Sequence, residues 1–591
     1  MKKAFDSVWR DGLFYKLLNL GVGGKFFNVL QSMYLHVNYT VRLQNGLSSP
    51  FVSTCGVRQG CNLSPLLFNI FINDLPQCFA DKCDAAILNS KSLNCLSWAD
   101  DLALISLSKE GLQNCINNLE SYCNKWKLRV NVSKTKVLVF TKVSINRLSN
   151  KFYIYGKEIQ VTDSYTYLGI PLTSSGKFKA ARKYLKTKAM RALFKLKSLL
   201  FSEKNIPIHL GMSLFNKFVL PILLYGAELT CFDQTSKTIK IIVSKQIPES
   251  SPKTVFSSFL NKLHLEGDLP ATVRKSVSSD LTHTYVIHFK KRSDKDRLLR
   301  LASGMKLEND NFAIENIRLP SHISIPEFDT IDMNFQKFLL GVHAKSSNDG
   351  IRGELGTFPI SINAQIQLIK YWHRLANLPE DSLLREAYDV VLSGEYDWTN
   401  HVTDILNYNG FGYVWTNPRL YHVNTLIDQL RLRLQDIYIQ EWHSSIQSNS
   451  KLSIYSTLKE RYRQKKYLSN VHNFELRRAI TKIRICSHKL NIEAGRYSKI
   501  PRDLRFCPFC PNEIEDERHF VMDCSRYDDK RTELFTLLST CSKDFATLCS
   551  IDKFKYILGG DNPHCVQVGK YIHDCLYRRT NSVNDMLDPL C

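Results

Sequence analysis

The sequence lacks the features that would direct the chain into or through a membrane. No run approaches the roughly 18 consecutive apolar residues of a membrane-spanning helix. The first residues, Met1–Asp6, contain no apolar core of a secretory signal peptide. We therefore expect an intracellular protein, in the nucleus or the cytoplasm, that is not secreted and has no membrane partner.

Acidic residues are too few to balance the basic ones. The chain has 79 Lys and Arg against 56 Asp and Glu, a formal net charge of +23. Such an excess favours a polyanionic partner, nucleic acid before a membrane surface, with a basic but uninvolved surface as the alternative. The 17 cysteines are an odd number, which argues against a fully paired disulfide framework. An apolar fraction of 44% over 591 residues is enough for packed cores in about three to five domains.

Two adjacent acids, Asp100 and Asp101, separate two short apolar runs within the stretch 96–106. This pattern predicts a strand, a tight turn and a second strand, with the acids at the turn. Neighbouring carboxylates repel each other and cannot both be buried unpaired. A divalent cation resolves the conflict because hard cations bind carboxylate oxygens. The alternative is an ordinary exposed hairpin turn, since turns favour Asp.

A polar loop bounded by Gly56 and Gly60 leads into an apolar helix that has Pro65 in its first turn. Its glycines allow close approach of the backbone to a ligand. Between them, Gln59 can hydrogen-bond a base or a sugar and Arg58 a phosphate. An ordinary loop that enters a core helix is the alternative. The spacing of apolar residues also predicts one or two helices over 1–36, a β-hairpin over 38–54 and an amphipathic helix over 111–129.

Five segments within the first 170 residues resemble, in order, the motifs of reverse transcriptases of non-LTR (LINE-like) retrotransposons. They are Lys2–Val8 (the second half of motif A), Gly56–Leu75 (motif B), Trp98–Asp101 (motif C), Asn131–Phe140 (motif D) and Tyr167–Ile170 (the primer-grip motif E). The resemblance implies an α+β fold: a right-hand polymerase palm, with an antiparallel sheet and helices, followed by a helical thumb. It also implies RNA-directed DNA polymerase activity with Mg²⁺ or Mn²⁺, an RNA template, a DNA primer or target, and dNTPs.

Site residues follow from this resemblance position by position. Asp100 and Asp101 match the metal-binding acids of motif C. The residues that match nucleotide or template contacts are Phe5, Arg58, Gln59, Gly60 and Lys134. Phe5 matches the aromatic gate that favours deoxynucleotides, with a core Phe as the alternative. Lys134 matches a lysine beside the leaving pyrophosphate, with a solvated Lys as the alternative.

One position departs from the family pattern. The first acid of motif A, which bridges two metal ions in this family, falls one position ahead of Met1. We expect Asp6 to face away from the metals, so it is not a substitute. We therefore expect a chain truncated within motif A, without fingers, and inactive as printed. The alternative function is that of a non-catalytic nucleic-acid-binding remnant or a domesticated protein.

A basic stretch without acids follows the fifth motif. It holds nine Lys and Arg between Lys177 and Lys197, and apolar residues fall at helical spacing on the other face. A basic helix face next to a primer grip should follow a phosphate backbone, with a solvated helix face as the alternative. The residues expected to bind nucleic acid are Lys179, Arg182, Lys183, Lys186 and Arg191.

Four residues near the C-terminus have metal-ligand spacing. They are Cys507, Cys510, His519 and Cys524, in the pattern Cys-x2-Cys-x8-His-x4-Cys. Two thiolates on a knuckle, with a His and a Cys on a following helix, complete a tetrahedral site, so we expect structural Zn²⁺. The pattern resembles the CCHC knuckle near the C-termini of non-LTR reverse transcriptases. Four coincidentally buried residues are the alternative, and Cys541 and Cys549 are close enough in sequence to be substitute ligands.

Composition shifts along the chain predict five regions. These are the partial palm over 1–172, the thumb over 173–232, an insert or linker with a small α/β unit over 233–332, a mostly helical region over 333–500, and the zinc knuckle with a tail over 501–591. In the insert we expect a linker over 244–254, strands over 285–289 and 312–317, and a helix over 293–302. Residues 451–505 hold 15 Lys or Arg against four acids, with Tyr455, Tyr462 and Tyr467 interleaved, which suits single-stranded nucleic acid.

Overall fold

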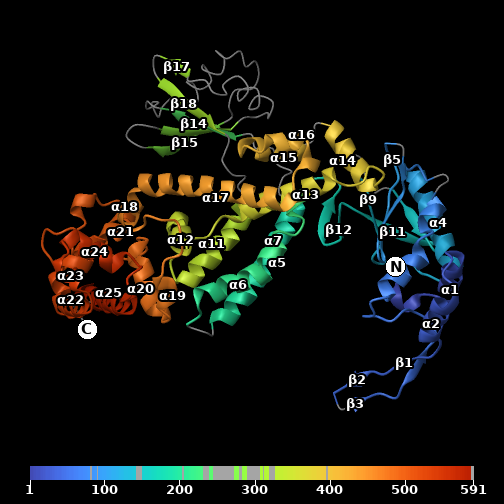
Figure 1. The fold of residues 1–591 in the computed structure, drawn as a ribbon, viewed down its shortest axis with the longest axis horizontal. Helices are drawn as coiled ribbons and strands as arrows, with labels where there is room; N and C mark the ends of the chain where they lie inside the picture. Colours follow the sequence, from blue (N-terminus) through green and yellow to red (C-terminus); the bar gives the residue numbers. More distant parts are fainter. Residues whose placement is uncertain are drawn as a thin grey trace. The chain divides into compact units, whose positions relative to one another are not determined.

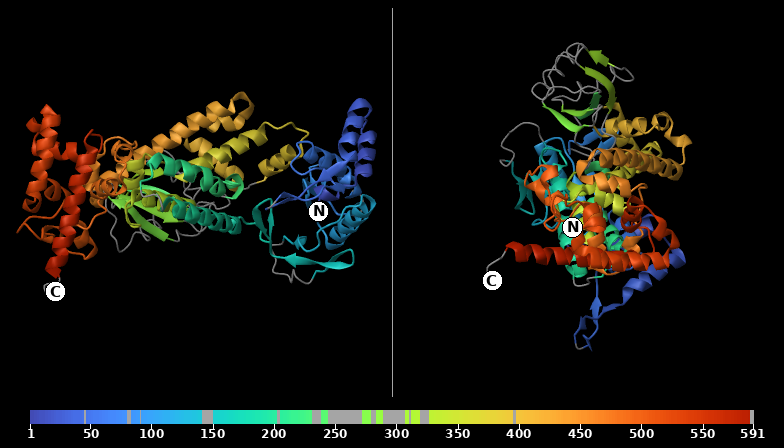
Figure 2. Two further views of the ribbon diagram at one scale, coloured as in Figure 1. Left: turned by 90° about the horizontal axis from the view of Figure 1, so that it is seen from below. Right: turned by 90° about the vertical axis from the view of Figure 1, so that its left-hand side faces the viewer.

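The computed structural model forms two compact units, each described here by itself. Unit 1 comprises Met1–Ala181 with Leu378–Glu395, and unit 2 comprises Arg182–Asn377 with Tyr396–Cys591 (Figures 1 and 2). None of the helices in the described part of the chain is both long and apolar enough to span a bilayer. The structure describes residues 1–44, 46–79, 83–89, 91–140, 150–201, 205–230, 238–243, 272–278, 283–288, 307–309, 312–318, 326–394 and 397–587.

Four helices of unit 1 enclose one apolar core. They are α1 (Arg10–Asn19), α2 (Gly24–Leu35), α3 (Ser64–Ile72) and α4 (Lys109–Lys125). Phe68 and Phe71 of α3 are fully buried in this core, because they lie three positions apart on one face of the helix. The helices predicted over 1–36 and 111–129 are therefore confirmed.

The strands of unit 1 form small separate sheets. The pairs are β1 (Val37–Tyr39) with β4 (Phe51–Ser53), β2 (Arg42–Leu43) with β3 (Gly46–Leu47), β5 (Ala86–Leu88) with β6 (Lys91–Leu93), β7 (Cys95–Trp98) with β8 (Asp101–Leu104), and β12 (Ser164–Tyr167) with β13 (Ile170–Thr173). A three-stranded sheet has the order β10 (Phe152–Ile154), β11 (Lys157–Thr162), β9 (Lys136–Leu138). All pairs are antiparallel except β11 with β9. The expected mixture of helices and antiparallel sheet is confirmed, but the described strands do not join into one large sheet.

A segment from far along the chain completes unit 1. Helix α14 (Leu383–Ser393) packs beside β5, and Lys91 of β6 forms a 2.8 Å ion pair with Glu386 of α14. Lys91 also donates to the carbonyl of Asp381 at 2.6 Å. The sequence assigned 333–500 to one helical region, and no local pattern indicated that this stretch returns to the first unit.

Unit 2 is mostly helical, as the sequence predicted for its second half. Helix α17 (Val423–Ser448) runs along α12 (Asn348–Leu355) and α13 (Ile360–Ala376), and Trp372 and Trp442 are buried there (Figure 1). The helices up to α17 are α5 (Lys179–Phe201), α6 (Ile208–Phe218), α7 (Leu220–Leu223), α8 (Ala227–Thr230), α11 (Pro326–Leu340), α12 (Asn348–Leu355), α13 (Ile360–Ala376), α15 (Asp397–Tyr408), α16 (Gly412–Thr416) and α17 (Val423–Ser448). Those that follow are α18 (Ser453–Leu458), α19 (Tyr467–Asn470), α20 (Phe474–Arg484), α21 (Asn491–Tyr497), α22 (Asp528–Cys541), α23 (Lys543–Thr547), α24 (Ser550–Leu558) and α25 (Cys565–Leu587).

The insert contains an antiparallel sheet with the strand order β15-β16-β14-β18-β17. Its strands are β14 (Thr238–Val243), β15 (Thr272–Ser278), β16 (His283–His288), β17 (Leu307–Asn309) and β18 (Phe312–Arg318). The two strands predicted near 285 and 312 are confirmed, and three others were missed. The predicted helix over 293–302 and the linker over 244–254 lie outside the described residues.

The basic stretch 451–505 differs from its predicted role. Arg484 and Glu354 form a fully buried ion pair, with both guanidinium–carboxylate contacts between 2.8 and 2.9 Å. The Tyr467 hydroxyl donates to the same carboxylate at 2.7 Å, and Tyr455 is also fully buried. These two tyrosines therefore belong to the core and cannot stack on bases, because packing rather than charge decided their orientation.

Candidate nucleic-acid and metal sites

The two adjacent acids lie at the turn between β7 and β8. Trp98 pairs with Asp101, so Ala99 and Asp100 form a two-residue hairpin turn. The predicted strand, turn and strand are confirmed. Ala99 has φ +51°, a left-handed conformation that favours glycine or asparagine in such turns. Asp101 is exposed and Asp100 half-exposed, so both carboxylates can reach a ligand in solvent.

The start of the chain lies beside this turn. The Met1 amino group donates a 2.8 Å hydrogen bond to the Asp100 carbonyl. Met1, Phe5 and Leu102 pack on the same apolar core, so the segment before Phe5 and the strand after Asp101 are neighbours. The Phe5 ring is stacked on Phe68 with centroids 5.1 Å apart, which fixes its plane.

The polar loop from Gly56 to Gly60 packs directly against the segment that carries Phe5. The backbone amide of Val57 donates to the Phe5 carbonyl at 2.8 Å. Gly56 has φ +85°, and a Cβ atom there would lie 2.7 Å from the Asp6 carbonyl oxygen, so only glycine fits. The Gln59 amide donates to the Asp6 carboxylate at 3.0 Å. Asp6 is therefore hydrogen-bonded to one of the predicted nucleotide contacts, and its expected place outside the metal set stays a prediction.

The remaining predicted nucleotide contacts differ in their availability. The Arg58 guanidinium donates to the Met33 carbonyl at 3.0 Å, so part of it holds the loop in place. Gly60 has φ +80° and open space around its Cα, which leaves room for a ligand. Lys134 is exposed in the turn that precedes β9. The structure thus brings Phe5, Gln59 and Gly60 into one neighbourhood.

Helix α5 has the predicted amphipathic character with one correction. The predicted apolar face is buried throughout, namely Leu185, Ala189, Leu193, Leu196 and Leu200. Lys179, Lys183 and Arg191 are exposed and Lys186 is half-exposed. Arg182 is only 5% exposed and donates to the Thr230 carbonyl at 3.0 Å, so its predicted place on the exposed basic face is wrong. Position 182 lies three residues before Leu185, on the same face of the helix, so this spacing could have predicted that Arg182 is buried.

The four predicted zinc ligands converge. Each offers a ligand atom, and these atoms all lie within 4.8 Å of one another. The Cys524 sulfur lies 3.9 Å from the Cys507 sulfur and 3.7 Å from the Cys510 sulfur. Cys507 is presented by a bridge between Phe506 and Ile514, and the His519–Asp523 helical turn ends at Cys524. Cys541 and Cys549 are exposed, and neither belongs to the group found among the described residues.

The chemistry of this group fits a metal ion. Nε2 of His519 is buried and has no hydrogen-bond partner in the described part of the chain, as expected of an atom that faces a ligand. The neighbouring Cys524 thiol, and after it His519, lowers the pKa of Cys507 against the opposing effect of burial. A thiolate is the form of cysteine that binds metal. The four residues can therefore hold a metal ion that prefers sulfur and nitrogen ligands.

A second group, Cys486, His488 and Glu517, was not anticipated from the sequence. His488 donates from Nε2 to Glu517 at 2.8 Å, while its Nδ1 accepts the backbone N–H of Leu490 at 3.3 Å. A metal-binding histidine instead donates its second ring N–H to an acceptor. We therefore interpret this group as a buried hydrogen-bonded unit, which links the residues just after α20 to the segment before His519.

Comparison with known proteins agrees with the motif assignment. Residues 1–172 match the family described as "Reverse transcriptase (RNA-dependent DNA polymerase)". A "Probable RNA-directed DNA polymerase from transposon BS" of Drosophila melanogaster is 30% identical over 237 residues, 39% of this chain and 25% of that protein. The "RNA-directed DNA polymerase from mobile element jockey" of Drosophila funebris is 26% identical over 235 residues, again 39% of this chain and 25% of that protein.

A third relative comes from another type of element. The "Retrovirus-related Pol polyprotein from type-2 retrotransposable element R2DM" of Drosophila melanogaster is 27% identical over 184 residues, 30% of this chain and 17% of that protein. The chain thus spans a quarter or less of the length of these relatives. The resemblance to reverse transcriptases of non-LTR retrotransposons is confirmed.

Proposed function

We infer from the reverse transcriptase domain of residues 1–172 that the chain is part of an RNA-directed DNA polymerase of a non-LTR retrotransposon. Its substrates would be an RNA template, a DNA primer or target, and dNTPs. The observation that carries this proposal is the β7–β8 turn, which presents Asp100 and Asp101 beside the segment that holds Phe5. The alternative is a nucleic-acid-binding remnant or domesticated protein that polymerises nothing.

Asp100 and Asp101 would hold Mg²⁺ or Mn²⁺ as hard oxygen ligands. When bound, such ions activate the primer hydroxyl and stabilise the charge on the transferred phosphoryl group. Phe5, held flat against Phe68, would limit the room for a 2′-hydroxyl on the incoming nucleotide. Gln59 and the open backbone at Gly60 would contact the template or the nucleotide, and Lys134 would neutralise the leaving pyrophosphate.

We expect this pair of acids by itself to support little or no nucleotide addition. We do not expect Asp6, whose carboxylate accepts from Gln59, to supply the third acid that this chemistry uses. Nucleic-acid binding does not depend on that acid and should persist. Measurements of nucleotide addition and of nucleic-acid binding therefore distinguish the enzyme proposal from its non-catalytic alternative.

Primer extension on an RNA template tests the proposal. The full chain is assayed with an annealed DNA primer, dNTPs and Mg²⁺ or Mn²⁺, beside Asp100→Asn and the matched control Asp6→Asn, which keeps an acceptor for Gln59. Any incorporation should disappear in Asp100→Asn and persist in Asp6→Asn. Incorporation that survives in Asp100→Asn would remove the assigned site, and robust incorporation by the unmodified chain would remove the expected inactivity.

We further propose that Cys507, Cys510, His519 and Cys524 hold structural Zn²⁺, supported by their convergence and by the unpartnered Nε2 of His519. Metal analysis of the purified chain should find one zinc, which Cys510→Ser loses. The matched control is Cys541→Ser, an exposed cysteine outside the group. Chelation should abolish protection of backbone amides around 505–525 in hydrogen exchange. Protection that is unchanged by chelation would contradict the zinc proposal.

We propose the division of the chain into a palm over 1–172, a thumb over 173–232, an insert over 233–332, a helical region over 333–500 and a knuckle with a tail over 501–591. The exposed cations of α5 support the thumb role, since a helix that exposes several Lys and Arg suits a phosphate backbone. Helix α14 is an exception within the helical region, because it packs beside β5 of the first unit.

A further inference from the structure

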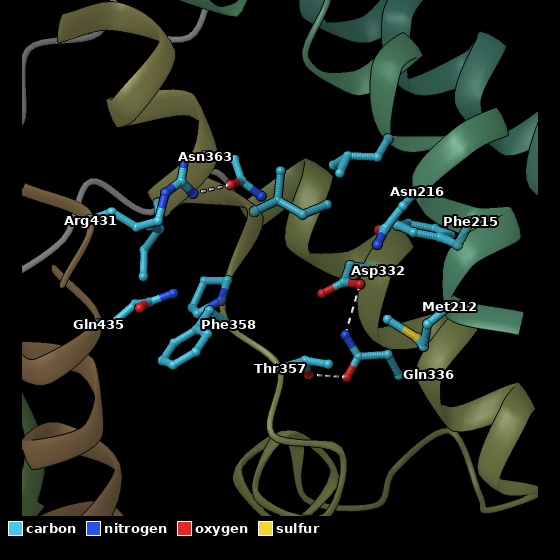
Figure 3. A pocket seen from close by; sticks show the side chains of 14 residues that line it. Met212, Phe215, Asn216, Asp332, Gln336, Thr357, Phe358, Asn363, Arg431 and Gln435 are labelled. Carbon is cyan, nitrogen blue, oxygen red and sulfur yellow. Dashed lines mark hydrogen bonds between the residues drawn. The ribbon is translucent and has the colours of Figure 1, made fainter. Parts of the chain in front are cut away.

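Unit 2 contains a cavity of about 190 Å³ that the polymerase assignment does not use (Figure 3). It lies where α6, α11, α13 and α17 converge, and the segment Thr357–Pro359 closes one side. Pockets for drug-sized ligands measure roughly 300–1,000 Å³, so this one suits a single ring system.

One buried acid in this cavity has an oxygen that forms an ion pair but no hydrogen bond. Asp332 is 3% exposed, and its Oδ1 accepts from the Gln336 amide at 2.8 Å. Gln336 is itself held by the Thr357 hydroxyl, which donates to its Oε1 at 2.9 Å. Oδ2 of Asp332 makes no hydrogen bond within the described residues, and the Arg352 guanidinium lies 3.7 Å away. Figure 3 shows this second oxygen pointing away from Gln336 into the open space.

A buried carboxylate oxygen that receives no hydrogen bond destabilises the fold. The presence of such an oxygen in this cavity favours a ligand that donates a hydrogen bond to it. Burial raises the pKa of Asp332 to about 6, against the opposing effects of Arg352 and Gln336. A carboxylate paired with the Arg352 guanidinium accepts hydrogen bonds and donates none. The missing partner is therefore an N–H or O–H donor.

The walls of the cavity suit a flat ring. Figure 3 shows Phe358 on one side of the hollow and Met212 with Phe215 on the other. Aromatic rings and the polarisable thioether of Met make favourable contacts with a flat aromatic ligand. A nucleobase stacked between such side chains and read through its N–H edge is the usual arrangement for an unpaired base in a protein.

The rim of the cavity carries a positive charge. Arg431 of α17 donates to the Asn363 side-chain oxygen at 3.2 Å, which holds the guanidinium at the edge of the hollow (Figure 3). A guanidinium has five N–H donors, so Arg431 retains donors for a phosphate. A base in the cavity would place its own backbone phosphate near this rim.

We propose that this cavity receives one unpaired base of a single-stranded nucleic acid, with its N–H edge donating to Asp332 and the adjoining phosphate contacting Arg431. This rests on the proposed function only in that the chain binds nucleic acid. The site would hold the strand by a base rather than by its backbone alone.

The test is an abasic scan with the full chain. Short single-stranded RNA and DNA oligonucleotides, each with one base removed at a successive position, are titrated by fluorescence anisotropy. Removal of the base that occupies the cavity should weaken binding about tenfold, since stacking of one base contributes an effect of that size. Asp332→Asn should weaken binding of the intact strand about as much and abolish the sensitivity to that position.

The matched control is Asp329→Asn, which also removes a carboxylate beside Arg352 but does not line the cavity. It should bind like the unmodified chain. Met212→Trp fills the hollow and decides the matter if Asp332→Asn does not fold. An unmodified chain that binds no nucleic acid overturns both the proposed function and this inference. Binding without any position-specific loss, or with the same loss in both cavity variants, overturns this inference alone and indicates a water-filled cavity.

Discussion

Helix α5 and the stretch 451–505 have similar basic composition and opposite structures. Along α5 the apolar residues return at helical spacing, so they take the buried side and leave Lys179, Lys183 and Arg191 exposed. In 451–505 helix α20 also buries an apolar face, with Ala479, Ile480 and Ile483, but here the fold buries several of the cations as well. Those buried are Lys459, Lys465, Arg477 and Arg484.

The difference shows that the number of Lys and Arg in a stretch does not predict how many of them are exposed on the surface. Glu354, about a hundred residues earlier than the stretch, accepts two hydrogen bonds from Arg484 and one from Tyr467. A buried cation needs such a partner, because its desolvation is otherwise too costly. Nothing in the local sequence of 451–505 indicated that the counter-charge of Arg484 would come from Glu354 of α12.

We expect the largest loss of stability from a substitution that breaks the buried ion pair between Arg484 and Glu354. Arg484→Met should lower the free energy of unfolding by about 3–5 kcal/mol, because Glu354 is left buried without its counter-charge. Urea denaturation followed by circular dichroism measures this. The control Arg461→Met changes an exposed cation of the same stretch and should stay within about 0.5 kcal/mol. A small effect of Arg484→Met would show that the two stretches do not differ as described.

Within α5, Arg182 is a buried cation among exposed ones, so its substitution tests whether burial determines the role of a cation. Arg182→Gln should lower the free energy of unfolding by about 1–3 kcal/mol, because the Thr230 carbonyl loses its buried donor. Nucleic-acid affinity of the folded variant should not change, since the side chain is buried. Lost affinity with unchanged stability would restore its predicted place on the binding face.

The exposed cations of α5 should behave in the opposite way. Replacing Lys183, Lys186 and Arg191 together by Gln should weaken nucleic-acid binding about tenfold or more and reduce the salt dependence by about 0.9 per lost phosphate contact. Stability should hardly change. The charge-matched control replaces three exposed cations of unit 1, Lys25, Lys109 and Lys157. Equal losses in both variants would mean that net charge, and not the α5 face, governs binding.

The smallest effect concerns the aromatics of the basic stretch. The Tyr455 hydroxyl donates to the Gly350 carbonyl at 3.2 Å, so Tyr455→Phe should cost about 1 kcal/mol of unfolding free energy. Affinity for single-stranded nucleic acid should be unchanged. A severalfold loss of affinity would mean that this tyrosine stacks on bases after all.

The two proposed metal sites show how much of a site the sequence can predict. The Cys507–Cys524 group lies within 18 consecutive residues, so spacing alone predicted which four side chains would meet. The turn at Asp100 and Asp101 was also predicted, because alternating strands and a two-residue turn are local features. Spacing did not predict which residues lie near this turn. Phe5 and the loop at Gly56 come close to it because they pack on a shared core, and only the resemblance to the family motifs indicated this.

The sequence by itself determined the amphipathic helices, the acidic hairpin, the cysteine cluster and the reverse transcriptase motifs, because each depends on the spacing of residues within one short stretch. Only the tertiary structure decided that Arg182 is buried, that Arg484 pairs with Glu354, that α14 belongs to unit 1, and that Asp332 faces a cavity built from four separate stretches of the chain. The physical reason is that a buried charge takes its orientation from partners far away along the chain. Spacing within one stretch carries no record of those partners.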